Sequence, residues 1–360
     1  MQRSFRGIVM LRRWPVLACV VLSTTLGLLP TRALALPGTG LSVWRAKLSP
    51  PSPGLSLGGG GLFGRTGLSS SSYLGAGGSA RYELYVPSTY RRGTAVPLVV
   101  VLHGCTQTAD AYRQQTRWDQ VAERNGFVVV IPEQSSRANP LSCWNFFRDT
   151  QRGSGEPAKI AGLTQWIMRR YSIDSRRVYV AGFSAGGAMA SVMAATYPDL
   201  YAALGVGSGC EYAATAACAG FKGIDPQQAG RSAFQAMGAR DRVMPFVVVH
   251  GDADTTVPPI NASQVVQQWQ LTDDMADDGG ANGSIPSAAA SSANGTAPGG
   301  QTYTVWSYSN GRGGNLGQLW IVHGMGHAWS GGCSCTAYSD PAGPDETSAM
   351  WAFFAAHPAG

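Results

Sequence analysis

Charged side chains are scarce in this 360-residue chain. Asp, Glu, Lys and Arg together make up 13% of the residues, against roughly 25% in an average soluble protein. Lysine occurs only at Lys47, Lys159 and Lys222, and there are five histidines in all. So few histidines leave a short list of candidates for any general base.

A strong charge of one sign is also missing from most of the chain. The formal net charge is +6, but residues 1–35 contain five arginines and no acidic residue. The remaining chain has 22 basic against 21 acidic residues. Nucleic acids and anionic membranes require a basic patch, so this balance argues against either as the main partner.

Long apolar runs are absent after the N-terminus. There, a basic stretch precedes the apolar run Trp14–Leu29 and the small residues of Ala33-Leu34-Ala35, as in a secretory signal peptide. We therefore expect residues 1–35 to be a signal peptide and the protein to be secreted, to the periplasm or outside the cell. An uncleaved anchor and a lipoprotein signal ending at Cys19 are the alternatives. No later segment reaches the roughly 18 apolar residues that span a bilayer, so we expect no membrane contact after cleavage.

Six cysteines remain after the leader, an even number that suits disulfides in an exported chain. Local spacing favours a Cys210–Cys218 pair, and we expect Cys105 to pair with Cys143. That choice leaves Cys333 and Cys335, which would close a very short ring, so other pairings among these last four stay open. No histidine lies near the cysteines at zinc-finger spacing, so we expect no metal.

The body of the chain alternates short apolar runs with helical patterns, which predicts an α/β fold with a mostly parallel sheet covered by helices on both faces. This domain is expected over residues 80–360. The Gly-, Ser- and Pro-rich residues 36–79 are interpreted as an N-terminal arm, and residues 272–301 as a long low-complexity surface loop. The expected helices cover Asp110–Arg124, Pro157–Arg170, Ala185–Thr196, Asn261–Leu271 and Asp345–Ala355.

The motif Gly182-Phe183-Ser184-Ala185-Gly186 joins an apolar strand pattern to a helix of small residues. In such a G-x-S-x-G turn the serine hydroxyl projects above the sheet, and the glycines leave space for neighbouring backbone. We predict Ser184 as a nucleophile. The alternative is that this segment is an ordinary Ser/Gly-rich turn between a strand and a helix, with no catalytic role.

A serine hydroxyl needs a base to take its proton. His327 follows Gly324 and Gly326 on a loop after a strand, where a base can reach back over the serine, whereas His323 stands at the strand end. We predict His327 as the base and keep His323 as the alternative.

The acid is expected after the strand Phe246–Val249. Asp254 and Asp252 both follow that strand, and the spacing favours Asp254, with Asp252 as a turn residue. The resulting chain order Ser, Asp, His is the one that α/β-hydrolases use.

The oxyanion hole is expected to combine the amides of Ala185 and Cys105, the latter in the loop that follows the strand Leu98–Leu102. Trp144 and Trp329 are candidates for apolar substrate-binding walls, although aromatic residues are more often ordinary core.

Six blocks of this sequence together resemble the polyhydroxybutyrate depolymerase-like esterases, a family that also includes feruloyl and acetylxylan esterases. The blocks span residues 80–357 and are Leu102-His103-Gly104-Cys105-Thr106-Gln107, Pro132-Glu133-Gln134, Cys143-Trp144-Asn145, Gly182-Phe183-Ser184-Ala185-Gly186-Gly187-Ala188-Met189, His250-Gly251-Asp252-Ala253-Asp254 and Gly326-His327-Ala328-Trp329-Ser330-Gly331-Gly332.

The resemblance implies an α/β-hydrolase fold, ester hydrolysis by a serine enzyme without metal or cofactor, and a Cys105 amide that helps to bind the oxyanion. We expect a hydroxyalkanoate polyester or its oligomers as substrate. A carbohydrate esterase acting on feruloyl or acetyl groups is the alternative enzyme. A non-catalytic binding protein on a hydrolase scaffold is the alternative from another class.

Overall fold

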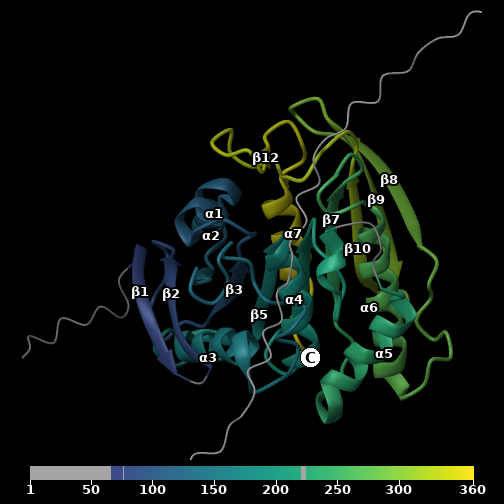
Figure 1. Ribbon diagram of the computed structural model, residues 1–360, viewed down its shortest axis with the longest axis horizontal. Helices are drawn as coiled ribbons and strands as arrows, with labels where there is room; N and C mark the ends of the chain where they lie inside the picture. The colour runs from purple at the N-terminus through teal and green to yellow at the C-terminus, as the bar shows by residue number, and fades with distance from the viewer. Residues whose placement is uncertain (1–65, 76, 220–223) are drawn as a thin grey trace, which may run out of the picture. The chain divides into compact units, whose positions relative to one another are not determined.

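The computed structural model describes residues 66–75, 77–219 and 224–360, through which a ten-stranded sheet runs (Figure 1). The strand order is β1-β2-β4-β3-β5-β6-β7-β10-β9-β8. The six neighbours from β4 to β10 run parallel, and antiparallel pairs extend each edge. The strands are β1 Gly67–Gly75, β2 Gly78–Val86, β3 Val96–Leu102, β4 Val128–Glu133, β5 Ile173–Phe183, β6 Ala203–Gly207, β7 Phe246–Gly251, β8 Ser291–Thr296, β9 Thr302–Ser309 and β10 Asn315–Val322, and a separate short pair joins β11 Trp329–Ser330 to β12 Ser339–Asp340.

Helices cover both faces of the sheet because its central strands are apolar on both sides. Leu98 and Val100 of β3 enter one buried cluster, and Val99 and Val101 enter the other. Helices α3, α4, α5 and α6 pack in the first cluster, and α1, α2 and α7 in the second. This three-layer arrangement is the predicted α/β architecture. The helices are α1 Ala109–Thr116, α2 Trp118–Asn125, α3 Gly155–Arg170, α4 Ala185–Thr196, α5 Pro226–Met237, α6 Ile260–Asp278 and α7 Glu346–Ala355, with short 3₁₀ turns at Ala216–Ala219 and Gly238–Arg240.

Both segments of low complexity contribute edge strands that their composition concealed. The segment 36–79, expected to precede the fold, supplies β1 and the first residues of β2. The segment 272–301, expected to be a loop, contains the end of α6 and all of β8. Nearly every side chain of β1 and β8 is exposed, so neither strand shows the apolar alternation that marks a strand in sequence. Residues 1–65, including the expected signal peptide, lie outside the described residues.

One expected helix is divided. Residues 110–124 form α1 and α2 because Arg117 adopts a left-handed backbone conformation, with φ 57°.

Among the described residues, no helix combines the length and apolar content that crossing a bilayer demands.

Candidate active site

Ser184 occupies the sharp turn between β5 and α4, at the carboxyl edge of the parallel strands. Its backbone has φ 57° and ψ −122°, a strained conformation for a residue with a side chain. A Cβ atom at Gly182 would collide with the Gly186 backbone, and one at Gly186 would collide with the Leu102 carbonyl. The two glycines therefore let the chain fold tightly enough to present the hydroxyl.

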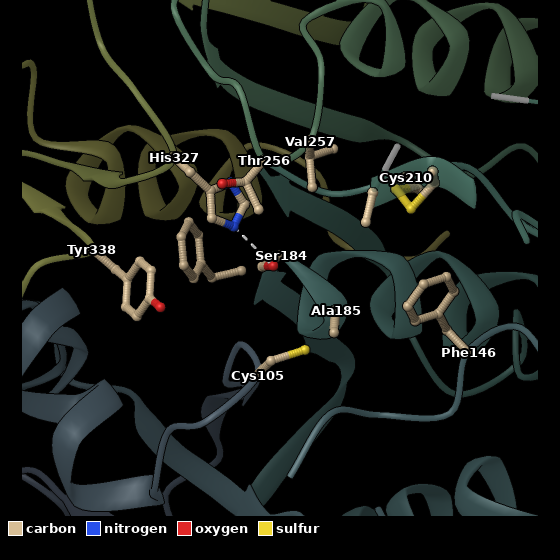
Figure 2. A pocket seen from close by; sticks show the side chains of 12 residues that line it. Cys105, Phe146, Ser184, Ala185, Cys210, Thr256, Val257, His327 and Tyr338 are labelled. Atoms are coloured by element: carbon tan, nitrogen blue, oxygen red, sulfur yellow. Dashed lines mark hydrogen bonds between the residues drawn. A yellow bond between two sulfur atoms is a disulfide. The ribbon is translucent and has the colours of Figure 1, made fainter. Parts of the chain in front are cut away.

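His327 lies over this hydroxyl. Its Nε2 atom is 2.9 Å from Ser184 Oγ, and its Nδ1 atom is 2.7 Å from Asp254 Oδ2 (Figure 2 shows the first contact). Because the carboxylate accepts from Nδ1–H, the neutral ring keeps Nε2 free to accept the serine proton. The structure thus brings the three predicted side chains, separated by up to 143 positions, into one hydrogen-bonded series.

The Asp254 carboxylate is held on both oxygens. The amides of Thr256 and Val257 each donate to Oδ1 at 2.8 Å, while Oδ2 faces His327 and lies 3.4 Å from His250 Nε2. Burial acts to raise the pKa of Asp254. The bonds from His250, His327 and the Val257 amide outweigh burial and hold that pKa well below its ordinary value. Asp254 is therefore an anion near neutral pH.

Asp252 and His323, the alternative acid and base, bond to each other and not to Ser184. His323 Nδ1 lies 2.8 Å from Asp252 Oδ2. His323 Nε2 lies 2.9 Å from the Thr304 hydroxyl, so both of its ring nitrogens are occupied.

Cys105, in the loop after β3, lines the same cavity as Ser184, and His103 holds that loop. The Gln134 amide donates to His103 Nε2 at 2.9 Å, so the ring proton resides on Nδ1 and is donated to the Gly104 carbonyl at 2.7 Å. That carbonyl belongs to the same planar peptide unit as the Cys105 N–H. Burial lowers the pKa of His103 and keeps the ring neutral. His103 thereby orients one of the two expected oxyanion donors, a role that its place at a strand end did not reveal.

A cavity of about 190 Å³ surrounds the serine hydroxyl. Figure 2 shows Tyr338 on one side of Ser184 and Phe146 on the other. The full lining is Cys105, Phe146, Phe183, Ser184, Ala185, Cys210, Cys218, Ala219, Thr256, Val257, His327 and Tyr338. Most of these residues present carbon or sulfur, so the cavity fits an apolar group joined to a polar reacting centre.

Trp144 and Trp329 do not form walls of this cavity, contrary to expectation. Both side chains are fully buried. Trp144 packs against the His103 ring at 5.5 Å, and Trp329 donates from Nε1 to Thr347 at 2.9 Å. Both tryptophans thus belong to the buried core next to the site, while Phe146 and Tyr338 line the cavity. Sequence shows an aromatic cluster near Trp144 but cannot tell which ring turns inward, because that depends on the path of the loop.

Two of the three disulfides in the described residues border the cavity. Cys105 pairs with Cys143 and Cys210 with Cys218, as expected, and Cys333 pairs with Cys335. The Cys105–Cys143 bond ties the loop after β3 to the segment that carries Phe146. In the described part of the chain, no three His, Cys, Asp or Glu side chains gather as metal ligands.

Comparison with known proteins places this geometry in a family. The family model for esterase PHB depolymerase matches residues 80–286, a range that includes Ser184 and Asp254 and ends before His327. Poly(3-hydroxyalkanoate) depolymerase C of Paucimonas lemoignei is 38% identical over 231 residues, which are 60% of this chain and 55% of that protein. Acetylxylan esterase A of Emericella nidulans is 35% identical over 209 residues, 52% of this chain and 66% of that protein. The matches thus span between about half and two thirds of these curated relatives.

A solved structure shares the fold. The acetyl xylan esterase from Aspergillus awamori superposes with a TM-score of 0.59 and 22% identity, over 80% of this chain and 99% of that one. The likeness confirms the predicted α/β-hydrolase architecture, and the family model covers more than half of the sequence. This chain belongs to the esterase PHB depolymerase family.

Proposed function

We propose that this protein is a secreted serine esterase in which Ser184 is the nucleophile, His327 the general base and Asp254 the carboxylate that orients the histidine. The observation that carries the proposal is the hydrogen-bonded series of these side chains at an apolar cavity. The relatives named above as depolymerase and esterase support the same chemistry.

The proposed reaction is an acyl transfer in two steps. As His327 Nε2 takes the proton, Ser184 Oγ attacks the ester carbonyl carbon and the carbonyl oxygen becomes an oxyanion. The Ala185 amide at the start of α4 and the Cys105 amide stabilise that oxyanion, each worth about 3–4 kcal/mol of barrier. His327 then gives its proton to the leaving alcohol. Water repeats the sequence on the acyl-enzyme and releases the acid.

For the substrate, we propose a hydroxyalkanoate polyester or its oligomers. The apolar lining around Ser184 suits the short aliphatic acyl unit of such an ester, and the depolymerase from Paucimonas lemoignei supports this class. Deacetylation of xylan is the second candidate, favoured by the acetylxylan esterases among the relatives. Export is part of the proposal because disulfides persist mainly in oxidising compartments outside the cytosol.

The decisive test is hydrolysis of p-nitrophenyl butyrate by the wild type and by Ser184→Ala. We expect the variant to lose turnover to background while its thermal unfolding temperature stays within a few degrees. A fluorophosphonate probe should label the wild type and not the variant. Absence of labelling in the wild type, together with absence of turnover, would favour a non-catalytic binding protein.

The substrate class is tested by assaying hydroxybutyrate oligomers, acetylated xylan and methyl ferulate side by side. The highest kcat/KM on the oligomers is expected. A preference for acetylated xylan by tenfold or more would replace the polyester by the carbohydrate substrate and leave the serine mechanism unchanged.

A further inference from the structure

The acid and the base stand on two loops that leave the sheet together. β7 and β10 are parallel neighbours, with Gly251 paired to Val322 at their carboxyl ends. The acid loop, residues 252–257, follows β7, and the histidine loop, residues 323–328, follows β10. Any relative shift of these loops changes the distance between Asp254 and His327.

Asp252 joins the two loops with both carboxylate oxygens. Oδ1 accepts from the Gly324 amide at 2.6 Å, and Oδ2 accepts from His323 Nδ1 at 2.8 Å. Next to it the Ala253 amide donates to the Met325 carbonyl at 3.0 Å. Burial acts to raise the pKa of Asp252, but the bonds from His323 and Gly324 outweigh it and lower that pKa below its ordinary value.

His323 extends this connection to the neighbouring strand β9. Its Nε2 atom lies 2.9 Å from Thr304 Oγ1, and its amide donates to the Thr302 carbonyl at 2.9 Å. The Gln301 side chain donates to the His323 carbonyl at 3.0 Å. The start of the histidine loop is thus anchored on one side to β9 and on the other to Asp252.

We propose that Asp252 and His323 form a positioning pair that sets the catalytic imidazole of His327 over Ser184. This role rests on the proposed esterase function. Only two residues, Met325 and Gly326, lie between Gly324 and His327, so a displacement of the anchored Gly324 amide is expected to move the imidazole as well. A misplacement of about 1 Å in a catalytic group can reduce turnover about 100-fold.

Exposure separates positioning from a purely stabilising role. The side chains of His323 and Asp252 are 41% and 42% exposed, and contacts between exposed polar side chains contribute little to folding. Loss of the pair should therefore appear in kcat far more than in the free energy of unfolding. KM should change little, because neither residue lines the cavity around Ser184.

The test compares Asp252→Ala and Asp252→Asn with a matched control, Asp174→Ala. Asp174 likewise accepts a backbone amide, from Arg176, and a side-chain cation, from Arg177. It lies at the start of β5, about 30 Å of strand from Ser184. Steady-state kcat and KM for p-nitrophenyl butyrate and the thermal unfolding temperature are measured for each.

Asp252→Ala is expected to lower kcat about 10- to 100-fold with KM within twofold of the wild type. Asp252→Asn retains an oxygen that can accept from Gly324 and should restore kcat to within about threefold. Asp174→Ala should match the wild type in kcat. In the double variant with His323→Ala, the losses in kcat should be less than additive, since the residues act as a unit.

Full kcat in Asp252→Ala, beside an inactive Ser184→Ala, would overturn the positioning role and leave the esterase proposal intact. An equal loss of kcat in Asp174→Ala would also overturn it, by showing a general loss of stability. An inactive, unlabelled wild type would instead overturn the proposed function on which the pair depends. If Asp252→Ala fails to fold, His323→Ala decides the matter by the same kcat criterion.

Discussion

Replacing Asp254 by Asn tests whether the carboxylate sets the tautomer of His327. In the wild type the amides of Thr256 and Val257 hold Oδ1, which leaves Oδ2 for His327 Nδ1. In Asp254→Asn the side-chain oxygen should stay on those two amides, since they can only donate. The new NH₂ group then faces Nδ1 of the imidazole.

An NH₂ group opposite Nδ1 favours the ring with its proton on Nε2. That nitrogen faces Ser184 Oγ and, once protonated, cannot accept the serine proton. The loss expected for a wrong tautomer is about 10⁴-fold in kcat, or about 5.4 kcal/mol of barrier. The fold should survive, because Asn has nearly the shape of Asp and keeps the contacts with the Thr256 amide, the Val257 amide and His327.

The assay is the initial rate on p-nitrophenyl butyrate under saturating conditions, with Asp252→Asn as the matched control on the same loop. The control should retain kcat within about threefold. A kcat for Asp254→Asn within tenfold of the wild type would refute the reasoning. A large loss of kcat in Asp252→Asn with little loss in Asp254→Asn would assign to Asp252 the role of the carboxylate that orients His327.

Two further predictions concern stability and the cavity. Burial raises the pKa of Glu346 well above its ordinary value. Within the described residues, the Ser330 amide is the one group that bonds to its carboxylate. The contribution of Glu346 to stability is therefore full at acid pH and is lost as pH rises through the folded-state pKa. Glu346→Gln should therefore be more stable than the wild type by about 1–2 kcal/mol at pH 8 relative to pH 4.5; thermal unfolding at both values measures this, and a pH-independent difference would contradict it. Phe146→Ala enlarges the cavity and should raise kcat/KM for an octanoyl ester relative to an acetyl ester about tenfold. Phe147→Ala, whose ring is 46% exposed and lies outside the cavity lining, should leave the ratio unchanged, and equal shifts in both variants would place the acyl group elsewhere.

Sequence alone determined what depends on neighbours along the chain. The G-x-S-x-G turn is local, because its two glycines and its strained serine lie within five residues, so the tight turn at Ser184 could be predicted from the sequence alone. The central parallel strands could also be predicted from the sequence, because a strand that is buried on both faces requires a continuous apolar run. The family resemblance followed from blocks of this kind.

Tertiary structure decided what depends on partners far apart in the chain. Asp252 and Asp254 both follow β7, and His323 and His327 both follow β10. Because β7 and β10 are neighbours, Asp252 bonds to His323 and Asp254 bonds to His327 beside Ser184. The cavity walls were equally hidden, because Trp144 and Phe146 are alike in composition and differ in the direction in which the loop turns them. The edge strands β1 and β8 were not predicted, because a strand with nearly all its side chains in solvent needs no alternation of apolar and polar residues. Such a strand is held by backbone hydrogen bonds to its neighbour, here β2 or β9.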